Sequence, residues 1–233
     1  MQELPRVALY ADLACPYAYI TAYRLRRLRA EYSGRVVIAH KSLALEYVNQ
    51  QPTPRRTLES ECPLLMLVEP ELPWEPWHAS SSEWPVTILP AFEAVKCAER
   101  QDFTLADDLD WAIRGAFFAG SRCISMRHVL LELAEQVGLA MDRFERDFDS
   151  GQARAQVIEE ARMGWERLKV AGSPTLVLPS GRQVSAATEL GLPEVEVDEQ
   201  RYGRVGGFPS APCVGADCLD LYRRILDEAV APR

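Results

Sequence analysis

Short apolar runs near the two ends of the chain enclose a long stretch with helical periodicity. Arg6 to Ala11 is an apolar run of strand-forming residues, and from Tyr17 onward apolar residues recur at spacings of three and four. Ser33-Gly34 interrupts the chain before a second apolar run, Val36 to Leu43. The pattern predicts a strand, a crossover helix and a second, parallel strand joined by a right-handed connection.

The next segment, from about Asn49 to Pro90, is irregular and rich in proline and tryptophan. Its proline density predicts that no long helix forms there. Its three tryptophans, Trp74, Trp77 and Trp84, would be costly to leave in water. We therefore expect this segment to pack over the rest of the protein, as a lid, as the wall of a cleft or as a cap on the core.

Helical periodicity from about Ala91 to Leu168 predicts a subdomain of four or five short helices. In one of these helices Ser125 is placed as the N-cap and Gly138 as the C-terminal stop. Strand signals return at Thr175 to Leu178 and near Gln183-Val184, with a turn between them. A loop-rich, acidic passage then leads to a closing helix.

Without the middle segment, the order of elements is β-α-β, then a β-hairpin, then α, which is the thioredoxin arrangement. We therefore expect an α/β, thioredoxin-like fold with a helical insertion between its β-α-β and β-β-α halves. Residues 1–60 and 169–233 are expected to form the thioredoxin-like domain. Residues 61–168 are expected to form the inserted loop and helical subdomain.

Composition narrows the class of protein. The chain of 233 residues has an apolar fraction of 48%, which is ordinary for a soluble globular protein. Its formal net charge of −8 argues against nucleic-acid binding, which needs a basic surface. No stretch approaches the ~20 apolar residues of a transmembrane helix, and the N-terminus lacks the features of a signal peptide. We predict a cytoplasmic protein with no membrane or nucleic-acid partner, whose six cysteines are mostly free thiols.

One of these cysteines stands where the first strand hands over to the helix, in the stretch DLACPYAYI. Cys15 comes directly before Pro16, which suits the first helical position because its missing N–H costs nothing there. Unpaired N–H groups and the positive end of the helix dipole favour a thiolate at this place. A thiol so placed can have a pKa of about 3.5–7.5 instead of about 8.5. Cys15 is therefore the candidate nucleophile, and Tyr17 is expected to flank its sulfur.

A second candidate element, Gly172-Ser173-Pro174-Thr175, lies immediately before the third predicted strand. Proline is tolerated at the first position of a strand. A cis bond before Pro174 would turn the chain sharply and expose the backbone of Ser173 beside Cys15. An extended thiol peptide could then pair with Ser173 like an added strand. Ser173 and Pro174 are therefore candidate substrate-binding residues.

DLACPYAYI, a helical insert that contains AFFAG, and VAGSPTLVLPSG together resemble the DsbA superfamily of thioredoxin-fold proteins. Within it, the chain is similar to the group of FrnE-like proteins, 2-hydroxychromene-2-carboxylate isomerases and kappa-class glutathione transferases. The resemblance covers most of the chain, although Gln50 to Pro85 matches nothing in this group. It implies that Cys15 is the redox or glutathione-activating residue and that Ala18 replaces the resolving cysteine. It also implies a cis Pro174 against the sulfur.

The resemblance also implies a role for Gly215-Ala216-Asp217, which is similar to the G-S-D run that holds the γ-glutamyl end of glutathione in kappa-class enzymes. Asp217 would receive the ammonium group of that ligand, although Ala216 departs from the serine. Asp217 can equally be the N-cap of the final helix. No metal and no tightly bound cofactor is expected, and glutathione or another small thiol is the expected ligand. Homodimers occur in this group.

Ala18 leaves no second cysteine on the turn, so a cycle that uses two cysteines of the turn is not expected. The favoured function is a thiol-disulfide oxidoreductase in which Cys15 works with an external small thiol. The alternatives are a glutathione-dependent, kappa-like transferase or isomerase, and a non-catalytic binding protein. Cys213 and Cys218 could form a disulfide but are expected to be structural or unrelated thiols. Cys62 is placed in a loop, with no strand before it.

Overall fold

The computed structural model describes residues 4–198, 203–208, 211 and 213–231. Its centre is a four-stranded sheet in the order β2-β1-β3-β4. The central strand β1 pairs in parallel with β2 and antiparallel with β3, and β3 pairs antiparallel with β4. The strands are β1 (Arg6–Ala11), β2 (Val37–Ser42), β3 (Thr175–Val177) and β4 (Gln183–Ser185). This order confirms the predicted thioredoxin-like α/β fold.

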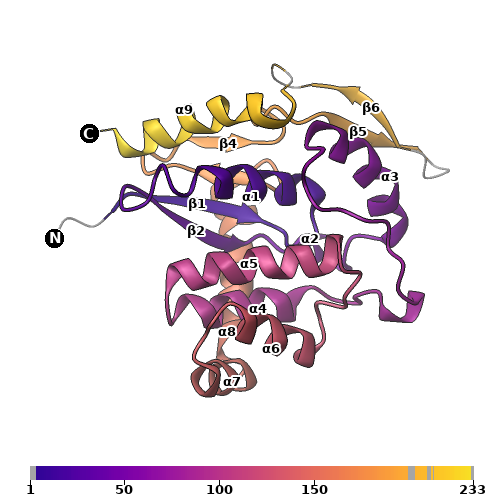
Figure 1. The fold of residues 1–233 in the computed structure, drawn as a ribbon, viewed down its shortest axis with the longest axis vertical. Coiled ribbons are helices and arrows are strands. Elements are labelled where there is room, and N and C mark those ends of the chain that lie inside the picture. Colours follow the sequence, from indigo (N-terminus) through magenta and orange to yellow (C-terminus); the bar gives the residue numbers. More distant parts are fainter. Residues whose placement is uncertain (1–3, 199–202, 209–210, 212, 232–233) are drawn as a thin grey trace.

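Helices surround the sheet in two groups (Figure 1). α1 (Pro16–Leu28) and α9 (Leu219–Val230) pack against each other. The helices of the insertion lie beyond β2, and α5 and α8 contact that strand. They are α4 (Leu89–Glu99), α5 (Phe103–Phe118), α6 (Arg127–Gln136), α7 (Met141–Asp149) and α8 (Gln152–Arg162), followed by a π-helical turn at Met163–Leu168. Within the described ranges, no helix has both the length and the apolar character needed to cross a membrane.

The segment between β2 and α4 is more ordered than its prolines predict. It contains α2 (Leu45–Asn49), α3 (Arg55–Leu65) and 3-10 turns at Met66–Val68 and Ser81–Glu83. α3 has 11 residues, which is an ordinary helix length, so the prediction that no long helix forms here is not contradicted. Pro54 precedes its first turn, where no helical hydrogen bond is lost, and Pro63 alone lies inside it.

The passage after β4 is also more regular than predicted. It holds an antiparallel hairpin of β5 (Glu194–Val197) and β6 (Gly203–Gly207). β6 has the sequence GRVGG, which lacks the alternation of apolar and polar residues that would have revealed a strand. α3 packs against both strands of this hairpin and against α1, and α3 and the hairpin lie together at one side of the molecule (Figure 1).

Helix α6 begins later than predicted. Its N-cap residue is Met126, not Ser125, whose hydroxyl is within 3.3 Å of the Cys123 sulfur instead. Gly138 follows the end of this helix with a φ of +83°, a conformation that favours glycine. The predicted C-terminal stop is therefore confirmed and the predicted N-cap is not.

Candidate active site at the start of α1

The chain leaves β1 at Ala11 and enters α1 at Pro16 through a tight turn. Cys15 is the N-cap residue of α1, and Pro16 takes the first helical position as predicted. Oδ1 of Asp12 accepts a hydrogen bond from the Ala14 N–H at 2.8 Å, in the manner of an Asx turn. The Cys15 N–H donates to the Asp12 carbonyl oxygen at 3.3 Å. Local hydrogen bonds therefore hold the cysteine at the helix start.

Asp12 also ties this turn to two neighbouring segments, a role that sequence reasoning missed. Its Oδ2 accepts a hydrogen bond from the Leu45 N–H at 2.8 Å, and its own N–H donates to Ser173 Oγ at 2.9 Å. Burial raises the pKa of Asp12 to about 6, against the opposing effects of the Leu45 and Ala14 N–H groups and the Arg114 charge. An aspartate two residues before Ala14 is the signal that could have revealed the turn.

The Ser173–Pro174 peptide bond is cis, and Ser173 lies directly against Cys15. The Cys15 thiol donates a hydrogen bond to the Ser173 carbonyl oxygen at 3.4 Å. Beside it is a cavity of about 180 Å³, here called the cis-proline cleft, whose lining includes Tyr17, Ser173, Pro174 and Glu194. Residues from both ends of the sequence therefore meet at one place.

The Cys15 sulfur is almost completely enclosed, since 5% of the residue is exposed. Burial is the main cause of a Cys15 pKa raised to about 12, and the carboxylates of Asp12 and Glu61 act in the same direction. The Ser173 side chain and the Ala18 N–H of the first helical turn bond to the sulfur and lower the pKa, but burial outweighs them. The expectation of a thiolate at neutral pH is therefore wrong for this arrangement of the chain.

Two adjacent residues of α3, Glu61 and Cys62, belong to the surroundings of Cys15. The Glu61 charge acts on Cys15, on Tyr17 and on Cys62, and the Cys15 charge acts on Cys62. Burial raises the pKa of Glu61 to about 7 and raises the pKa of the Cys62 thiol far above its ordinary value. Sequence reasoning placed Cys62 in a loop and missed this role, because the proline pattern concealed α3.

The helical insertion reaches the same turn through Arg114 of α5, which is 1% exposed. Its Nη1 donates to the carbonyl oxygens of Asp12 at 2.9 Å and Leu13 at 3.4 Å, and its Nε donates to Asp110 at 2.7 Å. Despite burial, Arg114 and His40 hold the pKa of Asp110 well below its usual range. Likewise, despite burial, Asp110 helps to raise the pKa of His40 to about 10. A buried ion network therefore positions the carbonyl groups of the turn.

A second cavity, of about 310 Å³, lies beside α3. We call it the tryptophan cavity, because Trp74, Trp77 and Trp84 line it together with Cys62 and Phe117. Trp77 and Trp84 also contact each other and the Phe117 ring. Of the three roles open for the tryptophan-rich segment, the structure therefore shows the wall of a cavity.

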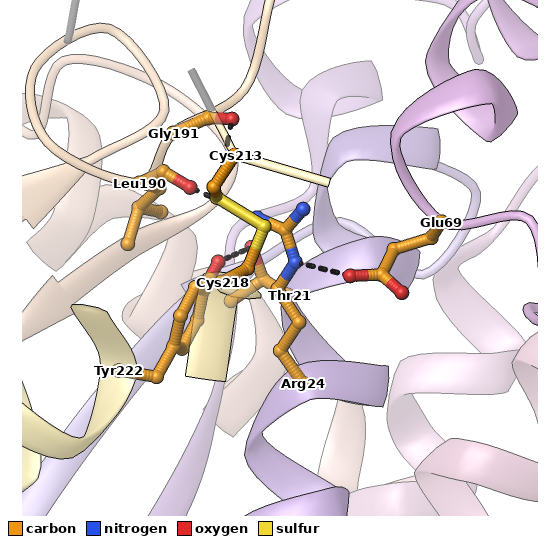
Figure 2. The surroundings of a disulfide bond; sticks show 8 residues. All are labelled: Thr21, Arg24, Glu69, Leu190, Gly191, Cys213, Cys218 and Tyr222. Carbon is orange, nitrogen blue, oxygen red and sulfur yellow. Dashed lines mark hydrogen bonds and ion pairs between the residues drawn. A yellow bond between two sulfur atoms is a disulfide. The ribbon is translucent and has the colours of Figure 1, made fainter. Parts of the chain in front are cut away.

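Neither of these two cavities is lined by Cys97, Cys123, Cys213 or Cys218. Cys213 and Cys218 form a disulfide at the start of α9, with 5.1 Å between their Cα atoms (Figure 2). The other four cysteines are free. Among the residues that the structure describes, no group of three or more histidine, cysteine or acidic side chains is arranged to hold a metal ion.

No family model and no curated protein matches the chain. The match to a candidate protein disulfide isomerase from Nitrosomonas europaea covers 97% of this chain and 99% of that protein, with a TM-score of 0.66 and 19% sequence identity. The cytosolic disulfide reductase DsbM from Pseudomonas aeruginosa, solved with GSH, matches 77% of this chain over 89% of its own, with a TM-score of 0.60 and 22% identity. The match to a 2-hydroxychromene-2-carboxylate isomerase covers 77% of this chain and 87% of the isomerase, with a TM-score of 0.56 and 18% sequence identity. The chain has the DsbA-like thioredoxin fold.

In this DsbA-like fold, Ala18 stands where the second cysteine of a C-x-x-C turn would be, and it is fully buried. Tyr17 links the helix start to the hairpin, because its hydroxyl accepts a hydrogen bond from the Val195 N–H at 3.0 Å.

Asp217 is exposed in the 3-10 turn before α9 and is not among the residues that line the cis-proline cleft. Cys218 is the N-cap of α9, so the cap prediction for Asp217 is wrong. Its role toward glutathione stays a prediction.

Proposed function

We propose that the chain catalyses thiol–disulfide exchange with Cys15 as its nucleophile. The observation that carries this proposal is the hydrogen bond between the Cys15 thiol and Ser173, at the start of α1 and beside the cis-proline cleft. DsbM is described as a disulfide reductase and the Nitrosomonas protein as a candidate disulfide isomerase, which supports the same chemistry here. The protein is then a thiol-dependent oxidoreductase.

In the first step, the Cys15 thiolate attacks one sulfur of a disulfide in the cis-proline cleft. A bond forms between Cys15 and that sulfur, and the second substrate sulfur leaves as a thiolate. Because Ala18 provides no thiol on the turn, an external small thiol such as glutathione completes the cycle. Ser173 and Pro174 hold the substrate, since the backbone beside a cis-proline can pair with an extended thiol peptide.

Cys15 has to lose its proton before it can attack. Since burial is the main cause of its raised pKa, access of substrate and solvent to the sulfur moves the pKa back toward the free value of about 8.5. The hydrogen bonds from Ala18 and Ser173 then favour the thiolate.

The test is the reduction of hydroxyethyl disulfide by glutathione in the presence of the protein. We expect Cys15→Ser to lower the rate at least roughly 100-fold, because it removes the nucleophile. Cys123→Ser is the control, since Cys123 is a free, partly exposed cysteine outside the site. Unchanged exchange in Cys15→Ser contradicts the proposal.

Two other results would favour the alternative functions. A glutathione-dependent conjugation that survives in Cys15→Ser supports the kappa-like transferase or isomerase. A protein that neither exchanges disulfides nor binds a small thiol supports the non-catalytic binding role.

In the proposed reaction the protein acts on a small thiol or a disulfide, and it uses no tightly bound cofactor. Glutathione is supported by the DsbM structure solved with GSH. The cytosolic description of DsbM supports a cytoplasmic location, whereas the Cys213–Cys218 disulfide argues against a strongly reducing compartment. A homodimer and the division at residues 1–60, 61–168 and 169–233 stay predictions.

A further inference from the structure

The structure offers one candidate thiol partner for Cys15, and it is Cys62. All six cysteines of the chain lie in the part that the structure describes. The others are bonded to each other or lie in the helical insertion: Cys213 with Cys218, Cys97 in α4, and Cys123 between α5 and α6. The charged groups that act on the Cys97 thiol also belong to the insertion, and Cys15 is not among them.

α3 brings Cys62 to the start of α1. The helix packs against α1 and against both strands of the β5–β6 hairpin, and Figure 1 shows it beside the end of α1 that follows β1. Cys62 and Cys15 are 4% and 5% exposed and belong to the same buried apolar cluster. The Cys15 charge acts on Cys62, and the Glu61 carboxylate acts on both sulfurs. Two buried thiols therefore lie at helices that pack against each other, and the Glu61 charge acts on both.

Cys62 also borders the tryptophan cavity, and the helix α3 that carries it is weakened at the next residue. Cys62 lines the tryptophan cavity, and the Trp74 side chain bonds to its sulfur, which favours the thiolate. Pro63 follows inside α3 and cannot donate the helical hydrogen bond to the Glu59 carbonyl oxygen. The loss of this bond makes the helix easier to deform at the position where Cys62 has to approach Cys15.

We propose that Cys62 is the resolving thiol for Cys15, so that α3 supplies the second cysteine that the turn lacks. This inference rests on the proposed function, because Cys62 acts on the mixed disulfide that Cys15 forms first. The Cys62 thiolate attacks the Cys15 sulfur, a Cys15–Cys62 bond forms, and the remaining half of the substrate leaves as a thiolate. The substrate disulfide has then gained two electrons from the two cysteines, and two external small thiols reduce the pair again as they join in a disulfide.

The test exposes the reduced full-length protein to glutathione disulfide, quenches it with acid, blocks free thiols and maps the peptides by mass spectrometry. In the wild type we expect a peptide pair linked through Cys15 and Cys62 and a short-lived glutathione adduct on Cys15. In Cys62→Ser the adduct should last at least roughly ten times longer, because the internal thiol that removes it is gone. Cys97→Ser is the matched control, a buried cysteine that should behave like the wild type.

The outcomes separate the two proposals. An adduct that lasts equally long in the wild type and in Cys62→Ser, with no linked Cys15–Cys62 peptide, overturns the inference and leaves Cys15 as a nucleophile resolved by external thiols. The absence of any adduct on Cys15 in all three proteins overturns the proposed function and this inference with it. If Cys62→Ser does not fold, the linked peptide in the wild type alone decides.

Discussion

Two helices of the molecule begin with a buried cysteine, and these two cysteines are in opposite chemical states. Cys15 is the N-cap of α1 and Cys218 is the N-cap of α9, and neither side chain makes a capping hydrogen bond. Their exposed fractions are 5% and 0%. Cys15 is nevertheless a free thiol, whereas Cys218 is bonded to Cys213. The start of a helix alone does not decide what a cysteine does.

The neighbours of each sulfur account for the difference. Cys15 bonds to Ser173, which lines a cleft, and the carboxylates of Asp12 and Glu61 act on its sulfur. The disulfide instead fills a tightly packed place: a Cβ on Gly191 would come within 2.7 Å of the Cys213 sulfur. The Ser173 residue that bonds to Cys15 therefore borders an open cleft, whereas the Cys213 sulfur is closely packed against Gly191.

Each helix start is also accompanied by a fully buried arginine. Arg114 donates to two carbonyl oxygens of the Cys15 turn and to Asp110. Near the disulfide, Arg24 donates to Glu69 at 2.7 Å and to the Leu190 carbonyl oxygen at 3.0 Å (Figure 2). Within the described part of the chain, Arg24 Nη2 and Glu69 Oε2 are buried without a hydrogen-bond partner. The hydrogen bonds of the Arg114–Asp110 pair beside Cys15 are thus more completely satisfied than those of the Arg24–Glu69 pair near the disulfide.

The largest expected effect comes from breaking the buried ion network that Arg114 forms with Asp110 and the Cys15 turn. Arg114→Met should lower the free energy of unfolding by about 3–5 kcal/mol, because it removes one of the two cations that face the buried Asp110 carboxylate and leaves only His40. Urea unfolding followed by circular dichroism measures this change. Arg122→Met is the control: its ion pair with Glu132 is partly exposed, and its loss should cost at most about 1 kcal/mol. Equal losses in both variants would contradict a special role for Arg114.

The second prediction tests the disulfide side of the comparison. Replacing Cys213 and Cys218 by alanine should lower the free energy of unfolding by about 2 kcal/mol, as expected for the closure of such a short loop. Thiol–disulfide exchange should remain near the wild-type rate, because neither residue lines the cis-proline cleft. Hydroxyethyl disulfide reduction and urea unfolding measure the two effects. Loss of exchange in a folded variant would show that this disulfide takes part in the reaction.

The sequence predicts one half of the Cys15 site and conceals the other. Cys15 next to Pro16, and Pro174 at the start of a strand, are local patterns that follow from helix and strand geometry. Glu61 and Arg114 come from α3 and α5, and they meet Cys15 only through tertiary packing. The direction of the Cys15 pKa was mispredicted for the same reason. The helix start could be read from the chain, but the burial that outweighs it could not.

A third prediction concerns the contact between the helix start and the β5–β6 hairpin. Tyr17→Phe removes the acceptor of the Val195 N–H and should lower the free energy of unfolding by about 1 kcal/mol. Hydrogen exchange of residues 194–197 should become faster, because the Val195 amide loses its partner. Alkylation of Cys15 by iodoacetamide should also become faster, whereas the disulfide at the start of α9 should be unaffected. Unchanged amide exchange would contradict the role assigned to Tyr17.

The smallest expected effect concerns the charge beside Cys15. An ionised Glu61 repels the ionised sulfur and so raises the Cys15 pKa. Glu61→Gln should therefore lower this pKa and speed iodoacetamide alkylation of Cys15 by roughly two- to five-fold at a fixed alkaline pH. The pKa of Glu61 is raised to about 7, so the carboxyl becomes neutral below this pH. The two alkylation profiles should consequently converge below pH 7 and separate above it.

Glu59→Gln is the matched control for this experiment, because Glu59 lies on the same helix and pairs with Arg55 at the surface. Its profile should follow the wild type across the whole pH range. A constant ratio between Glu61→Gln and the wild type, without convergence below pH 7, would mean that the substitution acts by loosening α3 and not through its charge. Convergence would instead show that the Glu61 charge on α3 controls the pKa of Cys15, the free cysteine at the start of α1. Cys218 at the start of α9 is bonded in a disulfide and has no such control.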